Sequence, residues 1–428
     1  MTITLRPSQA AAAEKLASVY RAGGLFAINS GDLGVGKTFE GLATIKLLGR
    51  RPLILCPKTA KTSWARAAAA FGVEPLDVIT HEALRGGRTK WYTTADKWGK
   101  FPADGLVLSD EWHRGVAGPD SKLNLIYAQC AAYKIPILAM SATPAHSPLN
   151  MRALGYLAGL HKFNDASFYK WCRAHGCFVL PSDRYRRWMF NTGPKGQAIM
   201  AKLHEELSPI MVRNRRESIP DFPACQTITE LVDVGDELAE INKIYSECDY
   251  PWGSDATPEK DILTAEQVRR VEHAKTGALL EMIPDHLEAG MSAVVFFSMQ
   301  ESVERLSEEL TKLNIQNVWM HGGISSENAR QVSIDKFQDN EVHVFIATAA
   351  CAGASLSLHD IHHARPRVAF LVPSWCPEIF SQSVGRIWRF GGTKAVQKIV
   401  LAANSVEETM FKRMSGHLKN MGVLLGDC

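Results

Sequence analysis

The sequence lacks the features that mark membrane, secreted and disulfide-stabilised proteins. None of its apolar runs reaches the ~18 residues that a membrane helix requires. The N-terminal segment MTITLRPSQA has no apolar core of the kind found in signal peptides. Only nine cysteines occur among 428 residues, without regular spacing, which predicts reduced thiols and no disulfide framework. A cytoplasmic protein is therefore expected.

An excess of charge of either sign is also lacking. The 48 basic and 45 acidic side chains leave a formal net charge of +3, which does not by itself indicate a polyanionic partner. Apolar residues make up 46% and charged residues 22% of the chain, so the composition is that of a folded globular protein. At roughly 150 residues per domain, the length allows two or three domains.

Short apolar segments alternate with helix-like segments in two parts of the chain. The strands expected in the first part are residues 25–29, 52–56, 76–80, 105–110 and 135–141, and those in the second part are 292–298, 317–322, 343–348, 367–373 and 397–403. Strands this apolar are typical of parallel sheets that helices cover on both faces. We therefore predict an α/β protein with two doubly wound parallel-sheet lobes over 1–150 and 276–428, and a helical insertion and hinge over 151–275.

The segment SGDLGVGKT follows the first expected strand and precedes a helix-like segment. It matches the pattern G-x-x-x-x-G-K-[ST] in the setting that a phosphate-binding loop requires, and its glycines allow backbone amides to turn toward an anion. Lys37 is expected to reach the β- and γ-phosphates, and Thr38 to ligate Mg²⁺. The expected nucleotide-binding residues of the loop are Gly31, Asp32, Gly34, Val35, Gly36, Lys37 and Thr38.

The segment GLVLSDEWH ends another apolar strand with two adjacent carboxylates. Asp110 is expected to hold the Mg²⁺ that bridges the phosphates, and Glu111 to orient and deprotonate the attacking water. Ser141 and Thr143, in ILAMSATPAHSP, follow a later strand. We expect these two hydroxyls to couple the carboxylate pair to the neighbouring domain.

The segment QSVGRIWRFGG carries Gln382, Arg386 and Arg389 at spacings i, i+4 and i+7, which predicts one face of a helix. Phosphoryl transfer is accelerated by positive charge on the departing γ-phosphate, and arginines of a second domain supply that charge when the domains close. We therefore expect all three residues to act in catalysis, with the lysine and the two carboxylates described above.

These segments, in this order, resemble the motifs of superfamily 2 helicases and translocases. The closest resemblance is to the Swi/Snf-type DNA-dependent ATPases, in the compact form encoded by phages and large DNA viruses. The segments are LRPSQ, GDLGVGKT, PLILCPKTAKTSW, THEAL, DEWHRGVAGPDSKLN, SATPAHSPLN, VVFFS, HGGIS, ATAACAGASLSLHD and QSVGRIWRFGG. The resemblance implies two RecA-like lobes, ATP and Mg²⁺ as cofactors, and a contact of Gln9 with adenine, with Arg6 among the nucleotide-binding residues.

The same resemblance implies contacts with the backbone of a nucleic acid. The residues concerned are Lys58, Thr59, His81, Ser298, His321, Gly322 and Thr348. In addition, residues 182–216 carry eight basic and three acidic side chains, a local charge of +5, with aromatic residues interleaved. That combination favours stacking and phosphate contact by Arg184, Arg186, Arg187 and Trp188, and a solvated or inter-lobe face is the alternative.

The leading interpretation is a monomeric ATP-driven translocase on duplex, forked or branched DNA, without a membrane partner, in the cytoplasm of a prokaryotic or virus-infected cell. Two alternatives stay open: a strand-separating helicase on DNA or RNA, and a nucleic-acid-binding or scaffold protein whose ATPase is silent. The intact phosphate-site residues and arginines argue against the silent site. Cys172, His175 and Cys177 suggest zinc by their proximity, but no fourth ligand has a suitable spacing.

Overall fold

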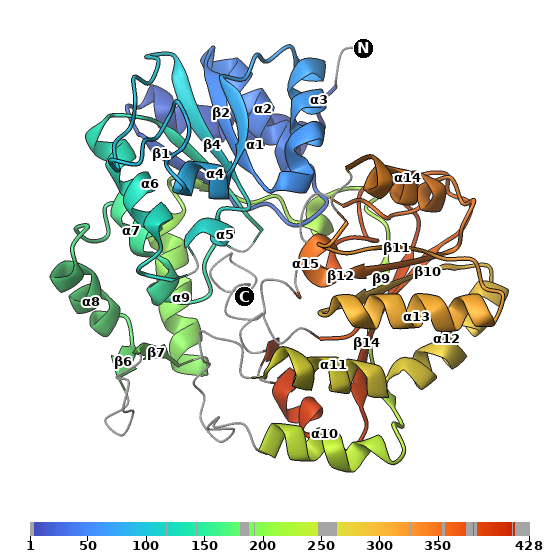
Figure 1. Cartoon of the computed structure of the whole chain (residues 1–428). Coiled ribbons are helices and arrows are strands. Elements are labelled where there is room, and N and C mark those ends of the chain that lie inside the picture. Colours follow the sequence, from blue (N-terminus) through green and yellow to red (C-terminus); the bar gives the residue numbers. More distant parts are fainter. Residues whose placement is uncertain are drawn as a thin grey trace. The chain divides into compact units, whose positions relative to one another are not determined.

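A computed structural model describes residues 4–116, 118–142, 144–179, 188–191, 193–246, 263–324, 327–352, 356–373, 380, 383–412 and 414–415. Within these ranges the chain forms two compact units, the first running through Ile219 and the second from Pro220 to Ser415. Each unit is built on a six-stranded sheet whose neighbouring strands are all parallel (Figure 1). The expected α/β fold with two RecA-like lobes is confirmed.

The sheet of the first unit has the strand order β3-β2-β4-β5-β1-β8. Its strands are β1 (Phe26–Asn29), β2 (Arg51–Cys56), β3 (Asp77–Thr80), β4 (Gly105–Asp110), β5 (Ile137–Met140) and β8 (Met211–Val212). Alternate residues of each strand enter opposite hydrophobic cores: Phe26 and Ile28 lie in one, and Ala27 lies in the other. Because side chains alternate across a strand, both faces must be covered, which explains the nearly continuous apolar runs.

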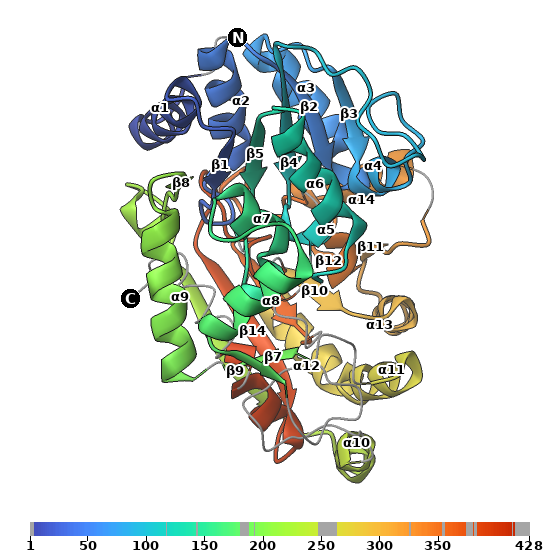
Figure 2. The same cartoon turned by 90° about the vertical axis from the view of Figure 1, so that its left-hand side faces the viewer.

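Helices cover both faces of this sheet (Figure 2). One core is completed by α1 (Pro7–Arg21), α2 (Lys37–Leu48) and α3 (Lys61–Phe71). The other is completed by α4 (His81–Arg85), α5 (His113–Val116), α6 (Lys122–Ala132), α7 (Arg152–Leu157), α8 (Asp165–Ala174) and α9 (Pro194–Leu207). A small antiparallel pair, β6 (Cys177–Val179) and β7 (Trp188–Phe190), joins the latter group.

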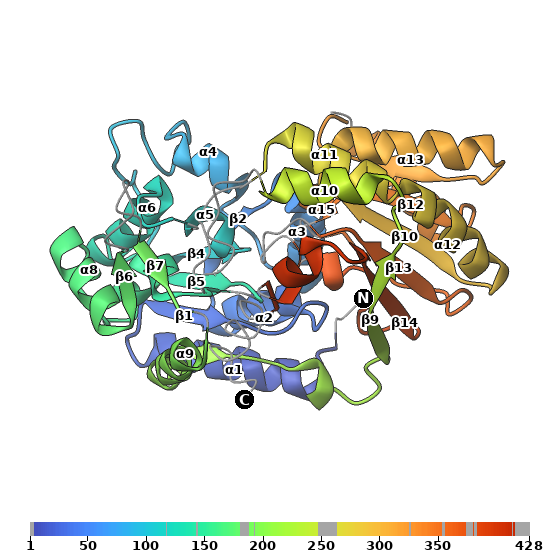
Figure 3. The ribbon, with the colours of Figure 1, turned by 90° about the horizontal axis from the view of Figure 1, so that it is seen from below.

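The second unit repeats the layered design with the strand order β11-β12-β10-β13-β14-β9. Its strands are β9 (Cys225–Val232), β10 (Ser292–Phe297), β11 (Val318–Met320), β12 (Val344–Thr348), β13 (Arg367–Leu371) and β14 (Ala395–Ala402). Its helices are α10 (Glu237–Ser246), α11 (Ala265–Ala274), α12 (Thr276–Glu288), α13 (Gln300–Lys312), α14 (Glu327–Gln338) and α15 (Ala349–Ala352). Figure 3 shows β9 beside β14, with which it pairs along eight residues.

All ten expected strands are present, but the segment expected to be helical also supplies strands. Within residues 151–275, β8 extends the first sheet and β9 extends the second, so the two units divide this segment between them at Ile219. Within the described ranges, no helix combines the length and apolar character that crossing a bilayer requires.

Candidate active site

The three N-terminal motifs lie at the carboxyl ends of neighbouring strands. β5 lies between β1 and β4 in the sheet, so the phosphate loop after β1, Ser141 after β5 and the carboxylate pair after β4 share one edge. Main-chain bonds hold these ends together: Ser141 N donates to Asn29 O over 3.1 Å, and Trp112 N donates to Met140 O over 3.0 Å. Ligands of open parallel sheets bind at this edge.

The phosphate loop turns through two glycines with positive φ, Gly34 at 82° and Gly36 at 94°. The positive φ of Gly36 favours glycine, and a Cβ at this position would also displace the end of the Gln9 side chain. Helix α2 begins directly at Lys37. The Lys37 ammonium donates to the carbonyls of Gly31 at 2.8 Å and Asp32 at 3.0 Å.

Burial and nearby carboxylates have opposite effects on the pKa of Lys37. Desolvation lowers the pKa of Lys37, and the nearby carboxylates of Glu111 and Asp110 oppose this effect. Negative phosphate oxygens placed beside the ammonium would favour its charged form further.

Residues of the N-terminal segment LRPSQ also contact the phosphate loop. The Gln9 amide nitrogen donates to Val35 O over 3.1 Å, and the Arg6 guanidinium donates to the same carbonyl. Arg6 N in turn donates to the Gln9 side-chain oxygen over 3.1 Å, at the start of α1. Both predicted adenine-side residues thus lie against the phosphate loop.

The carboxylate of Asp110 is fixed on both oxygens. The Trp64 indole, from α3, donates to Oδ2 over 2.7 Å, and Glu111 N donates to Oδ1 over 3.1 Å. Desolvation, with the negative charge of Glu111, raises the pKa of Asp110 to about 7. Glu111 itself has φ of 51°, a conformation that is uncommon for a residue other than glycine and that tends to persist at functional sites.

The Ser141 hydroxyl, after β5, contacts the segment that carries the carboxylate pair. His113 Nδ1 lies 2.8 Å from Ser141 Oγ and 3.7 Å from a carboxylate oxygen of Glu111. Ser141 is thus connected to Glu111 through His113, within its own unit. Thr143 lies outside the described residues.

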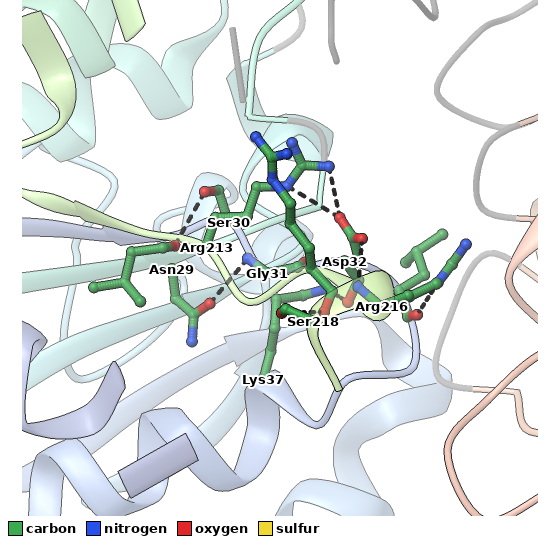
Figure 4. A network of polar contacts seen from close by, with 11 residues as sticks. Asn29, Ser30, Gly31, Asp32, Lys37, Arg213, Arg216 and Ser218 are labelled. Atoms are coloured by element: carbon green, nitrogen blue, oxygen red, sulfur yellow. Dashed lines mark hydrogen bonds and ion pairs between the residues drawn. The ribbon is translucent and has the colours of Figure 1, made fainter. Parts of the chain in front are cut away.

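Several residues of this site were not anticipated from the sequence. The buried carboxylate of Glu40 accepts from the amides of Asn29 at 2.8 Å and Asn214 at 2.7 Å, and burial raises the pKa of Glu40. Asp32 accepts from Arg213 (Figure 4), which is 181 positions away in the sequence. Trp64 and these partners follow no local pattern, so only the folded chain reveals them.

The residues predicted to contact nucleic acid differ in accessibility. Lys58 and Gly322 are exposed, and Ser298 is half-buried. His81, His321 and Thr348 are buried at 3%, 7% and 4% exposure. His81 Nε2 lies 2.8 Å from Asp110 O and His321 Nε2 lies 3.1 Å from a carboxylate oxygen of Glu304, so a phosphate would have to compete with these bonds. The side chain of Thr59 is not among those described, and the contacts stay predictions.

Of the basic aromatic segment, Arg184, Arg186 and Arg187 lie outside the described residues. Trp188 lies on β7, where its ring stacks on Tyr169 with centroids 4.7 Å apart, and the Arg173 guanidinium lies 5.2 Å from its centroid. The indole thus already has aromatic and cationic neighbours within its own unit, which a base would have to displace.

The arginine segment departs from the expected helix. Only Ser383 and Val384 are helical among its described residues, and residues 385–392 form turns and loop, so the prediction of one helical face is wrong. The main chain bonds to the preceding motif instead, with Leu358 N donating to Arg386 O over 3.0 Å. Arg386 and Arg389 both donate to Leu356 O, at 3.4 and 2.8 Å, and Gln382 lies outside the described residues.

At the suggested zinc ligands, the structure shows other contacts. Cys172 and Cys177 are buried and interact through their thiols, and this contact with burial raises the pKa of Cys177 far above its ordinary value. His175 Nδ1 lies 2.8 Å from Trp171 O. In the part of the chain that is described, no group of three metal-ligating side chains converges.

Comparison with known proteins locates this chain among helicases. Residues 274–391 match the family described as the helicase conserved C-terminal domain. A protein of Acanthamoeba polyphaga mimivirus, whose name describes an ATP-dependent RNA helicase, is 26% identical over 93% of this chain and 79% of its own length. The Saccharomyces cerevisiae chromatin-remodeling ATPase INO80 is 27% identical, but the match covers 33% of this chain and 9% of that protein. These matches support a superfamily 2 helicase.

The similarity to helicases indicates a nucleic-acid-dependent ATPase. A solved structure of S. cerevisiae Dbp5 bound to RNA and ADP BeF3 shares the fold of this chain, with a TM-score of 0.50 at 12% identity, over 92% of this chain and 83% of that one. The matches to the helicase C-terminal domain and to the mimivirus protein support an ATP-dependent activity and a nucleic-acid partner.

Proposed function

We propose that the first unit binds and hydrolyses ATP with the residues gathered at its sheet edge. In this scheme Lys37 binds the β- and γ-phosphates, Glu111 accepts a proton from the attacking water, and Gln9 with Arg6 lies toward the adenine. The observation that carries the proposal is the shared edge itself, where a phosphate loop and a pair of adjacent carboxylates follow strands separated by one strand only.

The donor set fits Mg²⁺. Mg²⁺ prefers hard oxygen ligands and is held in nucleotide sites by one or two protein groups together with phosphates and water. Asp110 offers a carboxylate oriented by Trp64 and by Glu111 N, and Thr38 offers a hydroxyl in the first turn of α2. Asp110 and Thr38 would hold the ion, which when bound neutralises the charge that develops on the phosphates. Orientation of the Asp110 carboxylate is the contribution of the protein.

We further propose that hydrolysis drives movement along duplex or branched DNA. Support comes from the motif order, which resembles the Swi/Snf-type ATPases, and from the partial match to a protein named as a chromatin-remodeling ATPase. Exposed Lys58 and Gly322 are available to phosphates, which provide contact without sequence selectivity.

A second candidate is a strand-separating RNA helicase. The observation that favours it is the mimivirus relative, whose name describes an RNA helicase and whose match covers 93% of this chain.

Parallel ATPase assays distinguish the two candidates. Turnover is measured with single-stranded DNA, duplex DNA, forked DNA and RNA at equal nucleotide concentration, beside displacement of a duplex strand and of a triplex-forming strand. Stimulation by duplex with triplex displacement supports the translocase. Stimulation by RNA with strand displacement would support the second candidate and contradict the first.

A further inference from the structure

A segment remote in sequence is bonded along the phosphate loop. β8 pairs with β1, and beyond the sheet Ser30 N donates to Val212 O over 2.8 Å and Asp32 N donates to Asn214 O over 3.0 Å. We call residues 213–216 the loop arm. Figure 4 shows the arm beside the loop, and both belong to the first unit.

The arm engages both carboxylate oxygens of Asp32. Arg213 donates to Oδ1 from Nε over 3.0 Å and from a terminal nitrogen over 2.7 Å, and Arg216 N donates to Oδ2 over 3.1 Å. The Arg213 and Asp32 side chains are 11% and 14% exposed, so water competes little with the pair. A paired, charge-assisted contact of this kind fixes orientation as well as distance. Arg216 Nε adds a bond of 2.9 Å to Leu33 O.

Asp32 connects this arm to the lysine of the phosphate site. Its carboxylate binds Arg213, while its carbonyl accepts from the Lys37 ammonium over 3.0 Å. A second connection runs through Asn214, whose amide donates to Glu40 over 2.7 Å. Glu40 lies on α2, the helix that begins at Lys37, so the arm holds the loop at its start and the helix just after it.

We propose that Arg213 is a positioning residue for ATP binding, acting through Asp32. A loop whose amides are already turned toward the phosphates does not have to be ordered when the nucleotide arrives, and loss of the Arg213–Asp32 pair adds that ordering cost to binding. The inference rests on the proposed role of Lys37 at the phosphates. The arm also continues through the turn at Arg216–Ser218 to Pro220, so the chain that leaves the first unit is anchored on its phosphate loop.

The test measures the Kd of a fluorescent ATP analogue, the KM for ATP, kcat and the thermal midpoint without nucleotide. The variants are Arg213→Met, Arg213→Lys and the nearly isosteric Asp32→Asn, and the double variant Arg213→Met with Asp32→Asn. We expect Arg213→Met and Asp32→Asn each to raise Kd and KM about tenfold, with little change in the thermal midpoint. Arg213→Lys keeps the charge without the paired geometry and should bind with intermediate affinity.

Non-additivity identifies the path through Asp32. The double variant should bind about as weakly as the worse single variant, since each change removes the same contact. Lys202→Met removes an exposed positive charge from the same unit and should bind ATP as the wild type does. Affinities equal to that of Lys202→Met, losses that multiply, or losses that merely follow a lower thermal midpoint in all variants would overturn the inference.

The same experiment separates this inference from the proposed function. If the wild type binds ATP and Lys37→Ala does not, the proposed site stands whatever the result for Arg213. If Lys37→Ala binds as the wild type does, the proposed phosphate site fails, and the role assigned to Arg213 fails with it.

Discussion

The two units place charged groups in contrasting surroundings. In the second unit, Lys275 and Glu407 form an ion pair of 2.7 Å with both side chains 1% exposed. Glu407 also accepts from Ala402 N at 2.8 Å and from the Tyr245 hydroxyl at 3.3 Å, so this cluster is satisfied by the protein alone. In the first unit, the Lys37 ammonium donates to neutral carbonyls, with the carboxylates of Glu111 and Asp110 near enough to affect its pKa.

The difference separates a cluster that stabilises a fold from one prepared for a ligand. In a buried ion pair, the charges and hydrogen-bonding groups are already engaged by the protein and are not available to a substrate. Removing one partner leaves an uncompensated charge. A half-buried lysine bonded to carbonyls, with two carboxylates nearby of which Asp110 has a raised pKa, gains most when an anion and a cation enter together. The following substitutions test this contrast, from the largest expected effect to the smallest.

The largest effect is expected at two arginines of the second unit, which would contradict the contrast if they act in ATP hydrolysis. If Arg386 or Arg389 acts on the departing γ-phosphate, alanine at either position should lower kcat by about 10³–10⁵-fold with little loss of ATP affinity. The measurement is nucleic-acid-stimulated kcat beside nucleotide Kd. Lys394→Ala, which removes an exposed charge nearby in sequence, is the control. A large affinity loss with normal kcat would contradict a catalytic role.

Within the first unit, substitutions of Lys37 and Glu111 should affect different quantities, nucleotide binding for Lys37 and turnover for Glu111. Glu111→Gln should lower kcat by about 10²–10⁴-fold and leave nucleotide Kd nearly unchanged, because Glu111 acts on water. Lys37→Ala should instead weaken nucleotide binding. Isothermal titration and single-turnover hydrolysis give the two quantities, with the exposed Glu74→Gln as control. A kcat of Glu111→Gln within a few-fold of the wild-type value would contradict the role of Glu111 in activating water.

The ion pair of Lys275 and Glu407 should affect the stability of the fold and leave ligand binding unchanged. Lys275→Met leaves Glu407 buried without its partner and should lower the free energy of unfolding by about 3–5 kcal/mol. Lys312→Met breaks a pair whose lysine is 66% exposed, so water screens the pair and the loss of stability should be much smaller. Urea titration of both variants measures the difference. Equal, small losses would show that the buried pair contributes no more than a surface one.

The smallest expected effect concerns the pH dependence of stability in the second unit. Burial, with the charges of Arg389 and Arg367 nearby, lowers the pKa of His359 to about 4. The unfolded chain therefore binds this proton first as the pH falls, and stability decreases from about pH 6.5 to about pH 4 and then levels off. His359→Asn should remove this part of the dependence of the urea midpoint on pH. An unchanged profile in that variant, matching exposed His362→Asn, would contradict the assignment.

Features whose signal is local were predictable from the sequence. The ten predicted strands appear in the sequence as apolar runs, and the phosphate loop appears as glycines followed by Lys37 and Thr38. β8 and β9 were missed for physical reasons. β8 has two residues, and β9 is a half-exposed edge strand without an apolar run.

Features that depend on the packing of distant segments were not predictable. The bond from Trp64 to Asp110 joins helix α3 to strand β4, and Arg213 reaches Asp32 across 181 positions. The helix expected around Arg386 fails for the same reason, because the Arg386 carbonyl accepts from Leu358 N of a distant segment, while the local bond from Arg386 N to Ser383 O closes only a turn. Spacing rules assume that a helical segment satisfies its own backbone, and this segment is bonded in part to another one.

The pairing of β9 with β14 determines where this chain can be divided. β9 covers β14 along all eight of its residues, from the Cys225–Ala395 pair to the Val232–Ala402 pair. A fragment that began at residue 276 would leave that side of β14 as an uncovered edge of backbone donors and acceptors, the template on which sheets of separate molecules join. Expressed alone, such a fragment should aggregate, and one that begins at Pro220 should stay soluble.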